Sequence, residues 1–511
     1  MTENAADWFI DRHVREGRGD KAAFVEVREG GRSISFAALS EKTGQVAAAL
    51  IKSNVRREER AALFVLDQIE FPLLFWGALK AGVQPIALNT LLATDVYRTI
   101  LNDSRASIAF VSYDLLDVVL PAAMDAPHVN QIVVIGGDAP DGTILYEDFV
   151  KGVVPQAALE CAGDEIAFWL YSSGSTGTPK GVRHVHDALR VTCETYGDQV
   201  LGIQESDKVF SAAKLFFAYG LGNGMSFPLS VGATALLHDG RPTPDSVSEI
   251  IATYQPTIFC GVPTLYAAMI HKWEAEGTHP NAPLRACISA GEALPAEIGR
   301  KWSQISGVDI IDGVGSTEML HIFLSNRPGS VEYGTSGLAV PGYEVRLVDD
   351  EGAEVGVGVI GELLVKGASA AADYWNQRQK SRTTFEGEWT RTGDKYEMNA
   401  AGRFVYCGRT DDLFKVSGIW VSPFEIEQAL VAHPAVLEAA VVAHRDEDDL
   451  EKPKAFIVLK DGKGQDELAD IKEFIKGEIG KWKYPRWVEV IDELPKTATG
   501  KIQRFKLRVQ Q

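Results

Sequence analysis

The chain has 511 residues, of which 45% are hydrophobic and 24% are charged, and its formal net charge is −19 at pH 7. This length accommodates two or three globular domains with a large hydrophobic core. The acidic excess argues against nonspecific binding to nucleic acid or to an anionic membrane surface, but it does not exclude a local site for an anion.

Two further features concern the cellular compartment. The five cysteines are far apart and form no Cys-x-x-Cys or Cys/His cluster, so the sequence predicts neither a zinc site nor a disulfide framework. The N-terminal residues are acidic and lack the basic and apolar regions of a signal peptide, and the sequence has no run of about 18 apolar residues. We therefore expect a cytoplasmic protein that does not insert into membranes.

Through most of the chain, short apolar runs alternate with amphipathic segments. Strands are predicted at 61–66, 108–112, 131–135 and 257–259, and helices at 70–81, 249–254 and 263–273. This alternation is typical of βαβ units in mostly parallel sheets that are covered on both faces. After Tyr333 the pattern changes to short segments separated by glycine, which predicts a small antiparallel β unit at about 333–408, with strands at 345–348, 361–365 and 404–406.

A boundary is predicted at Gly408-Arg-Thr-Asp-Asp412. The sequence Ser422-Pro-Phe-Glu425 predicts a helix start with a capping box and a proline at the first helical position, and His433-Pro434 ends that helix. The elements expected after it are strands at 437–443 and 455–459, a helix at 467–479 and a strand at 487–491. We predict an N-terminal domain of residues 1–410 and an α+β C-terminal domain of residues 411–511.

The segment Tyr171-Ser-Ser-Gly-Ser-Thr-Gly-Thr-Pro-Lys-Gly-Val182 combines small hydroxyl residues, three glycines and Lys180. Glycines and small hydroxyls let backbone N–H groups approach an anion closely, and the lysine adds positive charge, so the segment predicts a phosphate cradle. It is not the P-loop of NTPases, because Lys180 lies between Pro179 and Gly181. The alternative is a flexible linker, which the preceding apolar run at 166–170 disfavours.

Four weaker motifs accompany the cradle. Glu318 ends Asp312-Gly-Val-Gly-Ser-Thr-Glu318 and offers a carboxylate for Mg²⁺ near phosphates, and Asp394 ends Arg391-Thr-Gly-Asp394 and offers an acceptor for ribose hydroxyls. Ser289-Ala-Gly-Glu-Ala-Leu294 predicts a turn between a strand and a helix, and Lys501 follows a glycine in Pro495-Lys-Thr-Ala-Thr-Gly-Lys-Ile502. Taken singly, each is compatible with an ordinary surface turn or an exposed lysine.

Taken together and in this order, the motifs resemble the acyl-adenylate-forming superfamily, which contains acyl- and aryl-CoA ligases, adenylation domains and beetle luciferases. The resemblance extends from about Phe9 to Arg508. It implies an α/β fold with a large N-terminal region of two βαβ-type sheets plus a small β unit, followed by a small, mobile α+β C-terminal domain. It also implies a ligase that uses ATP, Mg²⁺ and coenzyme A and that forms an acyl-adenylate before the thioester.

The resemblance assigns roles to individual residues. Those implied to bind ATP are Ser172, Ser173, Gly174, Ser175, Thr176, Gly177, Thr178, Lys180, Gly291, Glu292, Ala293, Asp312, Gly313, Val314, Ser316, Thr317, Asp394, Arg409 and Lys501. Lys501, Glu318 and Thr176 are implied to be catalytic, with Thr176 and Glu318 around Mg²⁺. Asp411 is the implied hinge, and the implied contacts of CoA are Lys415, Ser417, Gly418 and Trp420.

One position departs from the superfamily pattern. The residue before the Gly of Gly-x-Thr-Glu is usually aromatic, whereas here it is Val314. We therefore expect weaker stacking on adenine or a pocket of a different shape.

The carboxylic acid is expected to bind at a second group of residues, namely Ala218, Tyr219, Gly315, His321 and Ile322. A flat ring suits these residues better than a long chain, because Tyr219 would block a deep acyl tunnel. The segment Phe216-Phe-Ala-Tyr-Gly-Leu-Gly-Asn223 and Val314 resemble benzoate–CoA ligases, so benzoate or a close analogue is favoured. Some of these residues are alternatively packing residues.

Other functions remain open at this point. The enzyme could act on another small carboxylic acid, cyclic or of medium chain length, or load a separate carrier protein. A nonenzymatic nucleotide sensor is disfavoured because Lys501, Glu318 and Asp394 are all present. A homodimer is one candidate for the oligomeric state, and a lysine acetylase is a candidate partner that would remove the charge of Lys501.

Overall fold

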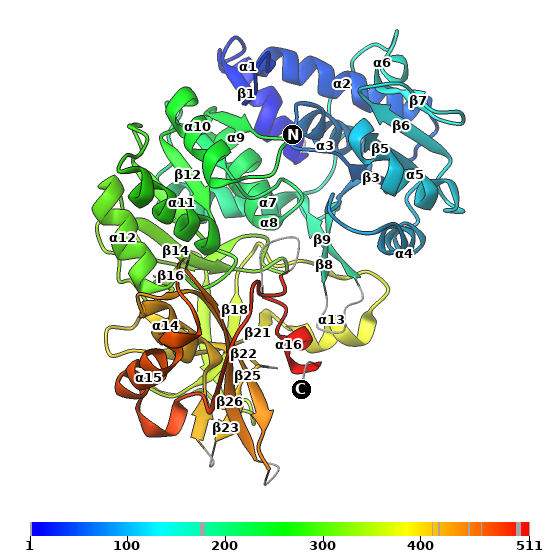
Figure 1. Ribbon diagram of the computed structural model, residues 1–511. Coiled ribbons are helices and arrows are strands. Elements are labelled where there is room, and N and C mark those ends of the chain that lie inside the picture. The colour runs from blue at the N-terminus through cyan, green and yellow to red at the C-terminus, as the bar shows by residue number, and fades with distance from the viewer. Residues whose placement is uncertain are drawn as a thin grey trace.

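The computed structural model describes residues 3–173, 179–410, 412–416, 419–447, 450–460, 462–496 and 502–509. Figure 1 shows two large sheets in the N-terminal part of the chain and a smaller unit, coloured orange to red, that follows them. Of the helices in the described part of the chain, none combines the length and apolar character needed to cross a bilayer.

The first sheet has eight strands and is mostly parallel. In spatial order they are β19 (Asp373–Tyr374), β9 (Pro179–Val185), β8 (Ile166–Ser173), β4 (Gln84–Ala87), β3 (Arg60–Phe64), β5 (Ile108–Ser112), β6 (Gln131–Ile135) and β7 (Ile144–Leu145). Only the pairings of β9 with β8 and of β19 with β9 are antiparallel. The strands predicted at 108–112 and 131–135 are confirmed, and the one predicted at 61–66 is β3.

Helices cover both faces of this sheet. They are α2 (Phe36–Lys52), α3 (Glu70–Lys80), α4 (Thr94–Ser104), α5 (Leu116–Met124) and α6 (Tyr146–Phe149), after the short η1 (Asp7–Asp11) and α1 (Arg12–Arg15). Apolar residues of α4 and α5 pack on one face, whereas α2 and α3 pack on the other. The helix predicted at 70–81 is confirmed as α3, which is buried along its whole length.

The second sheet has nine strands. In spatial order they are β16 (Leu338–Ala339), β15 (Ile322–Ser325), β14 (Ile310–Gly315), β13 (Ala286–Ser289), β12 (Ile258–Gly261), β10 (Lys208–Ser211), β11 (Thr234–Leu237), β1 (Ala22–Glu26) and β2 (Ser33–Ser35). Six central strands from β14 to β1 are parallel, and the edge strands are antiparallel. Parallel strands of this kind are buried on both faces, which explains their continuous apolar sequences.

Helices also cover both faces of the second sheet. Its outer helices are α10 (Pro244–Tyr254), α11 (Pro263–Glu276) and α12 (Ala296–Ser306). Its inner helical segments are α7 (His186–Thr192), η3 (Cys193–Gly197), α8 (Ala218–Leu221), η4 (Gly222–Ser226) and α9 (Phe227–Val231). The helix predicted at 249–254 begins earlier, at Pro244, because Thr243 and Ser246 form a reciprocal capping box at its start.

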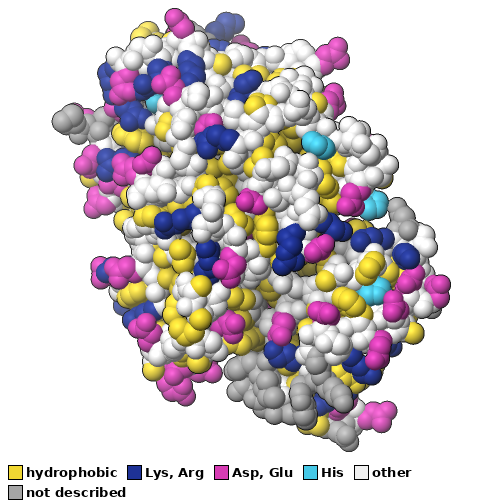
Figure 2. All heavy atoms as spheres, turned by 90° about the vertical axis from the view of Figure 1, so that its left-hand side faces the viewer, with side chains coloured by type: hydrophobic (Ala, Val, Ile, Leu, Met, Phe, Trp, Pro, Cys, Tyr) yellow, Lys and Arg dark blue, Asp and Glu magenta, His cyan; other side chains and the backbone are white. Residues whose placement is uncertain are grey.

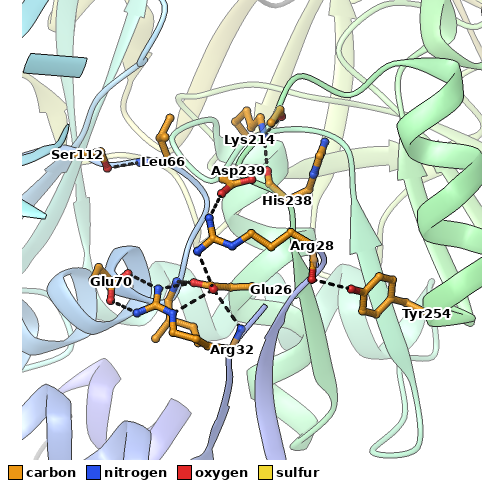
Figure 3. A network of polar contacts seen from close by, with 12 residues as sticks. Glu26, Arg28, Arg32, Leu66, Glu70, Ser112, Lys214, His238, Asp239 and Tyr254 are labelled. Atoms are coloured by element: carbon orange, nitrogen blue, oxygen red, sulfur yellow. Dashed lines mark hydrogen bonds and ion pairs between the residues drawn. The ribbon is translucent and has the colours of Figure 1, made fainter. Parts of the chain in front are cut away.

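A polar network joins the two sheets. Arg32, after β1, contacts Glu26 of the second sheet and both carboxylate oxygens of Glu70 in α3, at 2.6 and 2.8 Å (Figure 3). Arg28 links the same Glu26 to Asp239. Hydrogen bonds from Arg32 and from the Ile69 N–H outweigh burial and lower the pKa of Glu26 to about 2. This ion network, in which Glu26 and Glu70 are buried while Arg28 and Arg32 remain partly exposed, therefore links the two sheets.

The predicted antiparallel β unit is present. Its strands are β17 (Glu344–Val348), β18 (Gly361–Lys366), β20 (Phe385–Glu386), β21 (Trp389–Met398) and β22 (Phe404–Arg409), and α13 (Arg378–Thr384) precedes β20. The α+β unit after it contains β23 (Phe414–Val416), β24 (Ile419–Val421), α14 (Pro423–Ala432), β25 (Val436–Arg445), β26 (Glu451–Leu459), η5 (Gln465–Glu467), α15 (Leu468–Lys483), β27 (Trp487–Val490) and α16 (Arg504–Val509). The expected fold class is therefore confirmed.

The start of α14 differs in one detail from the prediction. The Ser422 side chain accepts a hydrogen bond from the Glu425 N–H, as expected for a capping box. The Glu425 carboxylate, however, accepts hydrogen bonds from Lys483 Nζ at 2.7 and 2.9 Å, and so ties α14 to α15.

On the face shown in Figure 2, acidic and basic side chains are intermixed.

Candidate active site

The segment predicted to be a phosphate cradle begins and ends in two paired strands. Strands β8 and β9 pair so that Ser172 lies opposite Lys180, at the two ends of the predicted loop. The Oγ of Ser172 is buried and has no hydrogen-bond partner among the described residues, so it is free to bind an oxygen of a ligand. The predicted ligands Gly174, Ser175, Thr176, Gly177 and Thr178 lie outside the described residues.

Lys180 reaches the second motif. Its Nζ lies 2.8 Å from Glu318 Oε1, although the two residues are 138 positions apart in the sequence. The same Nζ donates to the hydroxyl of Tyr374, also at 2.8 Å. The paired strands β8 and β9 and the Gly-x-Thr-Glu motif are thus in direct contact through Lys180.

Glu318 is ionised in this setting. Burial raises its pKa, but the charge of Lys180 and hydrogen bonds from Lys180 and Tyr374 lower it, and the net pKa lies below the usual range. An ionised, largely buried carboxylate beside a phosphate cradle fits a ligand for Mg²⁺. The other expected ligand, Thr176, lies outside the described residues.

The loop between β14 and β15 presents Glu318 under local strain. Ser316 Oγ accepts a hydrogen bond from the Met319 N–H at 3.1 Å, and Thr317 O accepts one from the Leu320 N–H at 3.2 Å. Leu320 has a φ of 65°, in the left-handed region that non-glycine residues rarely adopt, and is buried. This tight turn directs Glu318 toward Lys180.

Two further groups of residues implied to bind ATP, 291–293 and 312–314, lie near the ends of neighbouring parallel strands. Ser289 of β13 pairs in register with Asp312 of β14, so the segment 291–293 leaves the sheet at the end where residues 312–314 continue as the last part of β14. Gly291 has a φ of 96°, a positive value that glycine adopts readily and other residues rarely adopt, which explains why glycine occupies this position. Burial raises the pKa of the Asp312 carboxyl group well above its usual range.

Asp394 and Arg409 form an ion pair. They are register partners on β21 and β22, and Arg409 Nη1 lies 2.9 Å from Asp394 Oδ1. The charge of Asp394 outweighs burial and raises the pKa of Arg409. Gly393, with a φ of 71°, makes the turn just before Asp394.

The residues predicted to bind the acid lie close to His321. The Tyr219 ring stacks on the His321 ring with centroids 5.9 Å apart, and the Tyr219 hydroxyl lies 3.1 Å from both Gly261 O and Ile288 O. Burial lowers the pKa of His321 to about 3, so the imidazole is neutral, and its Nδ1 has no partner within the described ranges. Ile322, at the start of β15, is buried.

Two glycines allow close packing against His321. A Cβ on Gly315 would lie 2.5 Å from His321 O, so the main chains of β14 and β15 approach too closely for any side chain there. The sequence reasoning did not single out Gly222, where a Cβ would collide with the His321 ring. Ala218, at the start of α8, is half-buried.

The C-terminal residues predicted for adenylation, for the hinge and for CoA binding are only partly described. Lys415 and Trp420 are register partners in the β23–β24 hairpin, whereas Ser417, Gly418, the hinge residue Asp411 and Lys501 lie outside the described residues. Close to Lys501, Lys496 pairs with Ile502 and the Gln503 N–H donates to Pro495 O at 2.7 Å. These contacts hold the flanks of the Gly-Lys motif together.

Comparison with known proteins identifies the family. The model of the AMP-binding enzyme family matches residues 10–375, and that of the AMP-binding enzyme C-terminal domain matches residues 425–501. The chain therefore belongs to the AMP-binding enzyme family, and the resemblance noted from its motifs is confirmed.

Among its relatives are ligases for aromatic acids. The chain is 53% identical to the 4-hydroxybenzoate–CoA/benzoate–CoA ligase of Rhodopseudomonas palustris over 99% of this chain and 94% of that protein. It is 52% identical to the benzoate–CoA ligase of Thauera aromatica, over 99% and 95% of the two chains. A solved benzoate CoA ligase from Burkholderia xenovorans LB400 superimposes with a TM-score of 0.90 at 47% identity, covering 99% of this chain and 100% of that one.

Proposed function

We propose that this protein is an AMP-forming acid–thiol ligase of the benzoate–CoA ligase type. It activates benzoate or a close aromatic carboxylate with ATP, releases pyrophosphate, and transfers the acyl group from the adenylate to coenzyme A with release of AMP. The observation that carries this proposal is the contact of Lys180 with Glu318, which joins a phosphate cradle to a carboxylate suited to Mg²⁺. The aromatic-acid ligases among its relatives support the same reaction.

The nucleotide is proposed to bind across the residues just described. Ser172 and Lys180, with residues 173–178, hold the β- and γ-phosphates, while the segments 291–293 and 312–317 face the base. Asp394 and Arg409 hold the ribose through charge-assisted hydrogen bonds. When bound, Mg²⁺ neutralises charge on the phosphates, and Glu318 with Thr176 is proposed to hold it.

The acid is proposed to lie against Ala218, Tyr219, Gly315, His321 and Ile322. The Tyr219 hydroxyl faces main-chain carbonyls rather than a ligand, so the ring forms a fixed wall. The neutral His321 ring packs on this wall. A short, flat acid fits beside such rings, whereas a long acyl chain would require them to move.

The two half-reactions require two arrangements of the chain. Lys501 is proposed to stabilise charge that develops on the α-phosphate and acid oxygens in the first step. The C-terminal domain, residues 411–511, then rotates about Asp411 and brings up the face that carries Lys415, Ser417, Gly418 and Trp420 for CoA. A glycine at 418 would let the slender thiol arm pass close to the main chain.

An acid panel tests the proposal. Pyrophosphate release is measured with benzoate, with 2-, 3- and 4-substituted benzoates, with cyclohexanecarboxylate and with hexanoate, each with and without CoA. We expect benzoate-type acids to give the highest kcat/KM and AMP release to require CoA. Preference for hexanoate would contradict the aromatic assignment, and acyl-adenylate that is never transferred to CoA would favour loading of a carrier protein.

Three further assignments remain proposals. The substrates ATP and CoA suit a cytoplasmic enzyme, and a homodimer is the oligomeric state that we propose to test by sedimentation. Acetylation of Lys501 would remove the charge that the first step needs. Intact-mass analysis after treatment with a lysine acetylase, alongside activity, tests this idea, and an unmodified Lys501 would end it.

A further inference from the structure

Tyr374, which lies outside the motifs described in the sequence analysis, completes a triangle of hydrogen bonds with Lys180 and Glu318. Its hydroxyl lies 2.7 Å from Glu318 Oε1 and 2.8 Å from Lys180 Nζ, and these two atoms are themselves 2.8 Å apart. The ammonium group has no acceptor, so the hydroxyl must accept from Lys180 and donate its single hydrogen to the carboxylate. The direction of every bond in the triangle is therefore fixed.

The Tyr374 side chain is held firmly in this position. Tyr374 lies on β19, where it pairs with Val182 of β9, and its N–H donates to Ser381 Oγ of α13 at 3.0 Å. Its ring is buried against Val182, Ala371 and Phe385. The Ala371 N–H also donates to the main-chain oxygen of Glu318 at 2.7 Å, so the segment before β19 and the loop of Glu318 are joined directly.

The contacts fall on one oxygen of the carboxylate. Tyr374 and Lys180 both approach Oε1, and these two contacts orient the carboxylate group. The Lys180 ammonium also lies over the Tyr374 ring, 4.1 Å from its centroid. Tyr374 thus fixes the relative placement of the cation and the anion that the cradle needs.

We propose that Tyr374 is a positioning residue for adenylation, which holds Glu318 ready for the metal ion and Lys180 ready for phosphate. This rests on the proposed function. When a phosphate oxygen takes over one hydrogen bond of Lys180, the Tyr374 hydroxyl keeps its bond to Glu318 Oε1, so the carboxylate does not swing away. Fixing a charged ligand in advance removes the cost of ordering it when metal and nucleotide bind.

The experiment compares Tyr374→Phe, which removes the hydroxyl and keeps the ring, with Tyr374→Leu, which removes both. Tyr333→Phe is the matched control, because its hydroxyl also donates to a carboxylate, Asp309 Oδ1 at 2.7 Å. Asp309 directly precedes β14 of the second sheet, whereas Tyr374 lies on β19 of the first sheet. Binding of Mn²⁺, used as a probe for Mg²⁺, is measured by electron paramagnetic resonance with a nonhydrolysable ATP analogue. The Mg²⁺ concentration for half-maximal pyrophosphate release is measured in parallel.

We expect Y374F to bind Mn²⁺ about tenfold more weakly than the wild type, since a hydrogen bond to a charged group is lost. The Mg²⁺ requirement should rise by a similar factor, with a larger effect in Y374L and none in Y333F. If Y374F fails to fold, Ser381→Ala, which removes the acceptor of the Tyr374 N–H, should shift Mn²⁺ binding in the same direction by a smaller factor.

Unchanged Mn²⁺ binding and an unchanged Mg²⁺ requirement in folded Y374F would overturn the role of Tyr374. A wild-type protein that releases no pyrophosphate with any acid would instead overturn the proposed function. The two failures are distinguishable, because the Mn²⁺ measurement needs no turnover.

Discussion

Asp394 and Arg409 face each other across the antiparallel strands β21 and β22, with 2.9 Å between Asp394 Oδ1 and Arg409 Nη1. Arg409 also donates to Thr392 O at 3.2 Å, so the guanidinium is held against the turn that carries Asp394. Each member of the pair thereby fixes the position of the other.

Asp394→Asn tests this pair. The amide keeps the size but removes the charge, so both the bond from Arg409 and the bond to a ribose hydroxyl weaken. We expect KM for ATP to rise about tenfold or more, since hydrogen bonds to charged groups contribute ~1.5–3 kcal/mol. The matched control is Glu362→Gln, which weakens the Arg391–Glu362 pair of 2.7 Å on the same sheet and should leave KM for ATP unchanged.

Lys501→Ala should separate the two half-reactions. We expect adenylation, measured as acid-dependent pyrophosphate release, to fall by two orders of magnitude or more, about the effect of removing one preorganised group from a transition state. Conversion of supplied benzoyl-adenylate to the thioester should persist. Lys496→Ala is the control, because Lys496 lies in the same motif but pairs with Glu438 at 2.6 Å. Equal loss of both half-reactions in K501A would contradict the assigned role.

Two substitutions at Tyr219 test the acid pocket. In Tyr219→Phe the hydroxyl that faces Gly261 O and Ile288 O is lost but the ring remains, so we expect the order of preference among acids to stay the same. In Tyr219→Ala the wall itself is lost, and kcat/KM for hexanoate should rise relative to benzoate. The acid panel measures both, and a Y219A enzyme that still rejects hexanoate would show that another residue closes the pocket.

Leu320 offers a test of strain near Glu318. A left-handed conformation costs a non-glycine residue ~1–2 kcal/mol, whereas glycine adopts it freely. We therefore expect Leu320→Gly to be more stable than Leu320→Ala by about 1 kcal/mol, although both lose the same buried side chain. Denaturant unfolding monitored by fluorescence gives the comparison. The reverse order, with alanine more stable, would show that the turn relaxes.

His13 should make stability depend on pH. Burial lowers its pKa to about 4, while Arg18 Nε donates to its Nδ1 at 2.8 Å and its Nε2 bonds to Leu229 O. The unfolded state, with a pKa near 6.5, binds the proton more readily between pH 6.5 and 4, so stability falls as the pH drops through that range and is constant above it.

His13→Gln supplies the comparison for this titration. Its amide can accept from Arg18 and donate to Leu229 O, but it does not titrate. The pH dependence of its unfolding free energy should be shallower than that of the wild type, by up to about 3 kcal/mol over the range. Melting curves from pH 7 to 4 measure the difference, and parallel curves for the two proteins would rule out His13 as the titrating group.

Much of the fold could be predicted from the sequence, because the positions of many strands and helices depend on local patterns of apolar residues. The apolar runs at 108–112 and 131–135 are the strands found, and α3 ends at Lys80, before the Gly82 that stops its pattern. The predictions that differ from the structure concern the starts of helices, where contacts of individual side chains determine the boundary or the cap. The helix α10 starts at Pro244 because Thr243 and Ser246 cap each other, and Glu425 turns to Lys483 on another helix.

The sequence by itself predicted which residues make up the site: the phosphate cradle at 171–182, Glu318, Asp394 and Lys501, which occur in the order typical of the superfamily. The tertiary structure decided which side chains meet. Tyr374 belongs to none of the motifs described from the sequence. It contacts Glu318 because β19 pairs with β9 at the edge of the first sheet. Position 222 has no room for a Cβ, because helical segment η4 packs on the ring of His321. Such contacts depend on strand register and helix packing between distant segments, which no local spacing encodes.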